Sequence, residues 1–279
     1  MKNIRSVDCY SLNEEIDYTD KEENYIPYNV LGFAGRLTYG YDDRYLFEFN
    51  IGYNGSEQFS PNKRFGVFPA VSGAWVASNE KFWKENDVVT SLKLRASYGK
   101  VGNDKMGNDR FLYLNHITMN NSGLLGSLAQ GNKINEGLLG NVELTWETAL
   151  KQNYGVDIQL FKDLALSIDA FKEHRTNILI SRGMVPSLQG VPLTNVPRAN
   201  LGIVDNKGFE VELTYNKTVT KDLSLMFRSN FSYAKNKVVF SDEPTLGSDY
   251  AYQYEETGFS IGQQMGMAIS TRKKNLMII

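Results

Sequence analysis

The chain has 279 residues, 42% of them hydrophobic and 12% aromatic, and its 30 basic and 32 acidic side chains give a net charge of −2. This composition argues against a disordered chain and against a non-specific nucleic-acid binder, which is normally basic, and no apolar run approaches the roughly 18 residues of a spanning helix. A single cysteine, Cys9, excludes a disulfide framework, and only two histidines, His116 and His174, argue against a multi-histidine metal site.

Residues 1–28 combine a short basic start with acidic runs at residues 14–15 and 20–23. The start lacks the apolar stretch of a secretory signal peptide, and Cys9 lacks the apolar run of a lipoprotein signal. We therefore predict that residues 1–28 form an acidic, extramembrane loop segment.

From Leu31 onward the chain alternates with a period of two. Large apolar side chains fall on odd positions from Leu31 to Tyr41, while Gly, Ala, Arg36 and Thr38 fall between them. Alternation of this kind is typical of a strand, whose successive side chains point to opposite faces. Asp42 and Asp43 indicate a turn, and the alternation resumes at Tyr45, so the segment predicts a long hairpin.

The same alternation recurs downstream and predicts about eight strands, with no competing helical period of similar length. Only the segment from Ser78 to Asp87 has room for a helical turn. The further predicted strands are residues 65–77, 92–98, 150–160, 164–170, 209–215 and 223–233.

Strand length and loop rhythm favour a membrane barrel over a soluble sandwich. Several predicted strands run to about 10–16 residues, whereas strands of globular proteins have a mode near 5–6, and about 11 tilted residues match the apolar band of an outer-membrane barrel. Short connections at residues 42–43, 162–163 and 216–222 alternate with long ones at 54–64, 100–145, 181–206 and 241–258. Short periplasmic turns and long extracellular loops alternate in this way in an up-and-down barrel.

The two faces of the predicted strands differ in chemistry. One face is almost free of charge, and Tyr39, Tyr41 and Tyr45 cluster at a short turn as in an interfacial aromatic girdle. The other face would line a wet lumen. Its charged members are Arg36, Glu48, Lys93, Arg95, Asp157, Asp169, Glu210, Glu212 and Arg228.

Five ordered blocks then resemble one family, the SusC/RagA-type TonB-dependent outer-membrane transporters of Bacteroidota. The blocks are Leu31 to Leu46, Gly55 to Trp75, Leu92 to Asp104, Leu144 to Thr148 and Asn206 to Glu210. Together they place the resemblance between Asn29 and Gly266. The resemblance implies an all-β fold, an antiparallel up-and-down transmembrane β-barrel segment with about eight or nine strands of a larger barrel of about 22.

The resemblance also implies partners and limits. An intact member would import oligosaccharides, or peptides, with energy from the TonB complex and with a SusD-like lipoprotein as its lid. Signal peptide, plug and TonB-contacting segment are not evident, so we expect a fragment: residues 29–269 as a partial TonB-dependent receptor barrel, and residues 270–279 as an atypical, out-of-frame tail. Because lipid requires every backbone group to be paired, we expect the isolated chain to be incompetent for transport. Without a signal peptide, we expect its export to be doubtful.

Candidate chemistry is sparse, and the sequence assigns no catalytic, cofactor-binding or metal-binding residue. Asp104 and Asp109 end a repeated Gly-Asn-Asp, which leaves open whether this loop binds calcium. His174 beside Glu173 lacks the nucleophile and orienting partner that a hydrolase needs. Phe111 and Tyr113 are candidates for stacking on sugar rings. Neither an enzymatic nor a nucleic-acid function is predicted.

Two other classes of function remain open from the sequence. A small surface adhesin or structural outer-membrane barrel is expected to be a complete gene with its own export signal. A soluble all-β binding domain is expected to dissolve without detergent.

Overall fold

The computed structural model describes residues 2–12, 29–84, 86–107, 109–125, 129–185, 189–244 and 255–263. These residues form strands joined by loops, with two short 3-10 turns, Ala77–Asn79 and Leu193–Asn195. Neither of these helical turns within the described residues has the length and apolarity needed to cross a membrane. The strands are β1 Lys2–Leu12, β2 Val30–Tyr41, β3 Tyr45–Ser56, β4 Phe65–Val76, β5 Val89–Asn103, β6 Ile117–Leu125, β7 Ala129–Glu136, β8 Glu147–Leu160, β9 Leu164–Ile180, β10 Ala199–Thr220 and β11 Leu223–Phe240.

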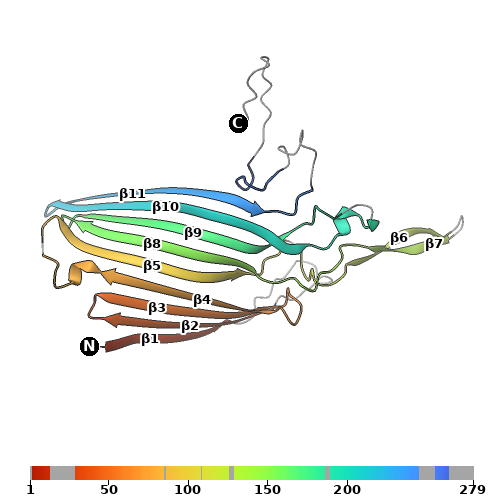
Figure 1. The fold of residues 1–279 in the computed structure, drawn as a ribbon, viewed down its shortest axis with the longest axis horizontal. Coiled ribbons are helices and arrows are strands. Elements are labelled where there is room, and N and C mark those ends of the chain that lie inside the picture. The colour runs from red at the N-terminus through yellow and green to blue at the C-terminus, as the bar shows by residue number, and fades with distance from the viewer. Residues whose placement is uncertain are drawn as a thin grey trace, which may run out of the picture.

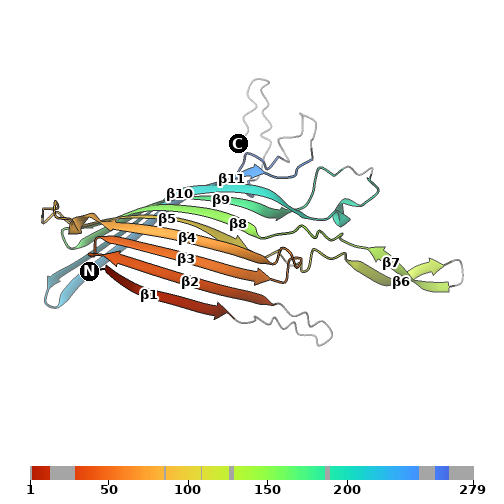
Figure 2. The same cartoon turned by 60° about the horizontal axis from the view of Figure 1, so that its bottom comes forward.

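Nine strands form one antiparallel sheet in chain order, from β1 at one edge to β11 at the other. The single departure is the separate hairpin of β6 and β7, which the chain forms between β5 and β8. Figure 1 shows this hairpin projecting well beyond the sheet, and Figure 2 shows the sheet curved across its width. The architecture is therefore an open, curved meander, as the predicted up-and-down segment requires.

The predicted strands lie within observed strands, apart from Ala77 at the end of predicted strand 65–77, and most observed strands are longer. β10 extends over 22 residues and β11 over 18, well beyond the predicted segments 209–215 and 223–233. The hairpin of β6 and β7 lies within a segment that the sequence analysis predicts to be a loop. The predicted helical turn near residue 78 is a 3-10 turn of three residues.

The structure differs from the sequence prediction in residues 2–12, where a loop was expected. These residues form β1, which pairs with β2 from Lys2 opposite Tyr41 to Leu12 opposite Gly32. Their sequence has no clean alternation of apolar and polar residues, so periodicity alone does not reveal the strand. The extramembrane location of this segment stays a prediction, and the predicted tail at residues 270–279 lies outside the described residues.

Most short connections lie at one end of the sheet, and the longest connections lie at the other. At one end the strands are joined by residues 42–44, 77–88, 161–163 and 221–222, and at the other by residues 57–64, 104–146 and 181–198. Asp42 and Asp43 both have positive φ, as do Phe161 and Lys162. Two successive left-handed residues match the type I′ turn, whose twist suits a tight hairpin. The predicted alternation of connection lengths is confirmed except at one step, because residues 77–88 make a longer connection than residues 57–64 at the other end.

The sheet itself has almost no apolar core. Leu31 is 59% exposed, Tyr154 61% and Phe231 59%, and most other large apolar side chains of the strands are exposed as well. The buried apolar residues gather instead at the end of the sheet that carries the long connections. Soluble monomers rarely expose continuous apolar surface of this extent.

Candidate functional site

One face of the sheet carries most of the charge of the strands, and we call it the polar face, although a group of lysines in β9, β10 and β11 lies on the opposite face. In β2 and β3 it holds Arg36 and Glu48, which form an ion pair of 2.6 Å. In β10 and β11 it holds Glu212 and Arg228, which are also paired. The predicted polar face is thus confirmed by contacts between strands, while the odd-numbered aromatic residues of β2 and β3 share the opposite, apolar face.

Arg95 is the centre of the most extensive polar network on this face. Its guanidinium donates two hydrogen bonds to Asp157 at 2.8 and 2.9 Å, one to Asp169 at 2.9 Å and one to Ser167 at 3.1 Å. Ser167 donates in turn to Asp157, and Asn153 donates to Asp169. We call these five residues the arginine network. Three neighbouring strands, β5, β8 and β9, are tied together by it.

Gly155 makes room for the arginine network. A Cβ at this position would lie 2.6 Å from Oδ1 of Asp169 and 2.8 Å from Cζ of Arg95. Atoms at these separations overlap, so any larger residue would displace the guanidinium or the carboxylate. Gly155 is itself buried, which shows how closely the two charged groups cover the backbone of β8.

A hollow of about 460 Å³ opens on the polar face beside the network. Polar residues from five adjacent strands line it, together with small residues and with Tyr39, Leu46 and Phe47. The polar members are Thr38, Glu48, Ser72, Lys93, Arg95, Ser97 and Asn153. The hollow therefore offers hydrogen-bonding groups beside apolar surface, as ligand-binding hollows usually do.

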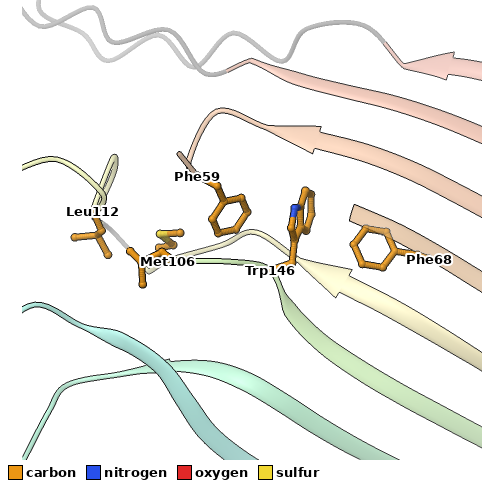
Figure 3. Close-up of a cluster of buried hydrophobic side chains, with 6 residues drawn as sticks. Phe59, Phe68, Met106, Leu112 and Trp146 are labelled. Atoms are coloured by element: carbon orange, nitrogen blue, oxygen red, sulfur yellow. The ribbon is translucent and has the colours of Figure 1, made fainter. Parts of the chain in front are cut away.

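A compact apolar cluster, here named the rim core, lies at the end of the sheet with the long connections. Figure 3 shows the rings of Phe59, Trp146 and Phe68 following one another, with ring centroids 5.3 and 5.2 Å apart along the row. The rim core consists of Phe59, Phe68, Met106, Leu112, Leu144 and Trp146. Because they come from loop 57–64, β4 and loop 104–146, these residues join segments far apart in the sequence.

Hydrogen bonds join the same loops around the rim core. The indole nitrogen of Trp146 donates to the carbonyl of Arg64 at 3.0 Å, and the Ser60 hydroxyl donates to the carbonyl of Val142. Asn200 donates to the carbonyl of Thr145 and accepts from the Thr145 amide. The long connections therefore form a braced rim rather than separate loops.

At the opposite end of the sheet, Glu80 gathers three donors. The hydroxyl of Tyr45 donates to it at 2.6 Å, the indole nitrogen of Trp75 at 3.1 Å and the guanidinium of Arg44 at 3.0 Å. The hydrogen bond from Tyr45 contributes most to lowering the pKa of Glu80 below its ordinary value, followed by that from Trp75. This carboxylate fixes the 77–88 connection against the turn between β2 and β3.

The loop proposed for calcium is placed only in part. Asp104 and Asp109 follow β5, but Asn108 lies outside the described residues. Asp109 forms an ion pair of 2.7 Å with Arg198 of the neighbouring loop. Among the residues that the structure describes, no group of three or more His, Cys, Asp or Glu side chains is arranged to hold a metal. The structure therefore gives Asp109 a role in bracing the rim.

His174 and Glu173 are not brought together. As neighbours in β9 they point to opposite faces. His174 lies with its Nδ1 atom 2.5 Å from Asp205 of β10, while Glu173 pairs with Arg175. The arrangement joins two strands and does not assemble the base considered from the sequence.

Phe111 and Tyr113 lie in the braced rim. Their rings meet edge to face with centroids 6.3 Å apart, and the guanidinium of Arg110 lies 5.3 Å from the centre of the Phe111 ring. The amide of Phe111 donates to Gln58. Their use in stacking on sugar rings stays a prediction.

Sequence reasoning identified Arg95, Asp157 and Asp169 as polar-face residues but not as partners. They are separated by 62 and 74 residues along the chain, so their meeting depends on strand register. The rim core was missed for a similar reason, since Phe59, Met106 and Leu112 belong to no periodic segment. A sequence signal that could have indicated the rim core is Trp146, which lies between the predicted strands 92–98 and 150–160.

Comparison with known proteins gives consistent matches. A sequence profile for the family described as TonB dependent receptor-like, beta-barrel, matches residues 10–266. The TonB-dependent receptor P39 of Formosa agariphila is 34% identical over 233 residues, which are 83% of this chain and 21% of that protein. The TonB-dependent receptor SusC of Bacteroides thetaiotaomicron is 28% identical over 252 residues, which are 88% of this chain and 24% of that protein. The chain spans between a fifth and a quarter of the length of these relatives.

Solved structures match over the same part of the chain. The RagAB peptide importer in its closed-closed state superposes with a TM-score of 0.66 and 25% identity, covering 77% of this chain and 22% of the matched chain. A second RagAB peptide transporter structure gives a TM-score of 0.65 and 26% identity over 76% of this chain.

Proposed function

We propose, since the chain belongs to the TonB dependent receptor-like β-barrel family, that it forms part of the wall of an outer-membrane active transporter. In this proposal the apolar face of the sheet contacts lipid and the polar face lines a wet lumen. The observation that carries the proposal is the opposition of the two faces. Phe47 and Phe49 are 45% and 36% exposed on one face, whereas Glu48 between them is paired with Arg36 on the other.

The polar face supports transport rather than catalysis. Its charges are paired between strands, as in the arginine network, so the wall presents a hydrated surface with little net charge. Cargo passing such a wall would meet hydrogen-bonding groups without a strong field of one sign. We propose no catalytic role for the chain, and we propose oligosaccharides, or peptides, as the cargo of the whole transporter.

The two ends of the sheet support two partner assignments. The braced rim at the long connections would face the exterior and meet a SusD-like lipoprotein lid, and energy would come from the TonB complex through a plug elsewhere in the receptor. The peptide importer RagAB, whose chain resembles this one, makes peptides a natural alternative to glycans. The described residues of this chain would supply only part of the barrel wall and of its rim.

We propose that the isolated chain does not transport. Within the described sheet, β1 pairs only with β2 and β11 only with β10, so each outer edge offers unpaired backbone groups. In lipid such groups must find partners, and further strands of the same receptor would provide them.

Adjacent residues of β4 give a matched test of the two faces. In a Cys9→Ser background, Val71→Cys places a thiol on the apolar face, beside Phe49 and Tyr98, and Ser72→Cys places one on the polar face, beside Glu48 and Ser97. In membranes, a fluorophore on residue 71 should be quenched by brominated lipid, and residue 72 should react with a water-soluble maleimide. If residue 71 is not quenched and the chain dissolves without detergent, the result would instead favour a soluble all-β domain.

A further inference from the structure

Three lysines form a row across the last three strands of the sheet. Lys207 of β10 is the register partner of both Lys172 of β9 and Lys235 of β11. Since neighbouring strands lie about 4.8 Å apart, the three side chains start within about 10 Å of one another. All three are exposed. We call Lys172, Lys207 and Lys235 the lysine row.

The lysine row belongs to the apolar face. Lys207 is two residues from Phe209, and Lys235 is two residues from Tyr233, in strands that are regular at these positions. The rings of Phe209 and Tyr233 face each other with centroids 5.8 Å apart, which confirms that both strands present these residues on the same side. The lysines therefore lie directly beside an aromatic row.

The lysine row lacks sufficient counter-charge. No ion pair in the described residues involves any of the three lysines. On the adjacent row of the same face stand His174, Asp205 and Lys237, and the Asp205 carboxylate already contacts His174. Like charges at directly opposed positions of a sheet repel one another, so a bound anion would stabilise this arrangement.

A shallow hollow of about 520 Å³ joins the lysine row to the aromatic row. Its lining combines the three ammonium-bearing side chains with the rings of Tyr154, Phe209 and Tyr233. Phosphate groups suit the lysine end of this hollow, and hydrocarbon chains suit its aromatic end. A lipid with a phosphate-bearing head group carries a phosphate followed by hydrocarbon chains, in the order in which this hollow presents lysines and rings.

The depth of the lysine row agrees with this occupant. Lys207 and Lys217 bracket the apolar stretch of β10 on this face, ten residues apart. At ~3.3 Å per residue and a tilt of ~45° they are separated by about 23 Å, close to the ~25 Å apolar band of an outer-membrane barrel. The lysine row lies at the border nearer the long connections, which in the proposed function is the outer leaflet.

We infer that the lysine row, with Tyr154, Phe209 and Tyr233, binds the phosphate-bearing head group of a lipid in the outer leaflet. The inference rests on the proposed function, because it requires the apolar face to contact lipid. A lysine at a membrane border also reaches water without any ligand, and that behaviour is the competing outcome of the test.

The test compares lipid binding by the membrane-inserted protein, solubilised in mild detergent and observed by native mass spectrometry. The probes are bisphosphorylated lipid A, the same lipid without its phosphates, and inorganic phosphate as a competitor. The variant is the triple substitution K172Q/K207Q/K235Q. The matched control, K81Q/K84Q/K221Q, removes three exposed lysines from the short-turn end.

We expect the wild type and the control to bind phosphorylated lipid A, and the lysine-row variant to bind it at least tenfold more weakly, since each lysine near an anionic lipid contributes about fivefold. Lipid without phosphates should bind as weakly as in the variant, and equimolar inorganic phosphate should not compete. Equal binding by the variant, equal binding of the dephosphorylated lipid, or full competition by inorganic phosphate would each overturn the inference.

A second readout separates this inference from the proposed function. The fluorophore on residue 71 reports lipid contact independently of the lysines. If it is quenched by brominated lipid and lipid A still fails to bind, the lipid site is wrong and the transporter wall stands. If it is not quenched in the labelled protein with an intact lysine row, the proposed function itself fails.

Discussion

Arg95 and Asp157 lie 62 residues apart in the chain and meet on the polar face through two parallel hydrogen bonds of 2.8 and 2.9 Å. Two-pronged pairing of this kind is stronger and more directional than a single ion pair. It requires the register that places Arg95 opposite Gly155, one pleat from Asp157. The pair thus reports whether β5 and β8 are correctly aligned.

Arg95→Met should destabilise the membrane-inserted protein by about 1–2 kcal/mol, because it leaves Asp157 and Asp169 close together without their shared cation. Thermal unfolding in detergent measures the loss. Arg228→Met, which removes a more exposed pair at the edge strand, should change stability by less than about 1 kcal/mol. Equal losses in the two variants would contradict a special role for the arginine network.

Gly155→Ala should destabilise the protein by about 1–3 kcal/mol, since the added methyl group overlaps Asp169 and Arg95. Gly73→Ala is the control, because the nearest atom to its added Cβ is a carbonyl oxygen 3.9 Å away. The control should be neutral or slightly stabilising, because alanine has less backbone entropy than glycine to lose on folding. The same unfolding measurement decides between them, and a neutral Gly155→Ala would show that the network rearranges freely.

Trp146→Ala should loosen the rim by about 3–5 kcal/mol, the usual loss for a buried aromatic residue. Trp146 is 6% exposed and joins Phe59 to Phe68. Limited proteolysis should then cut the long connections faster while the strands stay protected. Phe82→Ala, at a ring that is 67% exposed, should leave the cleavage rate unchanged.

Acid should release the 77–88 connection. The hydrogen bond from Tyr45, together with those from Trp75 and Arg44, holds the pKa of Glu80 below its ordinary value of 4.5. The folded state therefore binds the proton more weakly than the unfolded state. The stabilisation is complete above pH 4.5 and is lost as the pH falls through the lower pKa of the folded state.

Fluorescence of Trp75 and thermal unfolding, followed from pH 7 to pH 3, measure this transition. Glu80→Gln should remove the pH dependence of this connection, and Tyr45→Phe should move its midpoint upward, closer to the ordinary value. An unchanged midpoint in Tyr45→Phe would show that the hydroxyl does not control the titration.

Much of the sheet was predictable because its strands obey a strict period of two. The hairpin around Asp42 and Asp43 follows from alternation and turn chemistry alone, and the family resemblance read from the sequence blocks is confirmed by the profile match over residues 10–266. The grouping of charged residues on one face followed from the same alternation, whereas their pairing did not. These features depend on local sequence.

Other features depend on contacts that no local pattern encodes. β1 pairs with β2 although its own residues do not alternate cleanly. Ser60 reaches Val142 across 82 residues of chain, and the lysine row exists only because three strands share one register. Partners chosen by register or by loop packing become visible only once the sheet is assembled.

The chain-order arrangement of the sheet affects how such a protein is built. Each strand completes its pairing with the strand just before or just after it, apart from the step from β5 to β8. Assembly can therefore proceed by adding one hairpin at a time to a growing margin, with little entropy lost to distant loop closure. By the same logic, evolution can lengthen or shorten the wall in whole hairpins without rearranging the pairs already made.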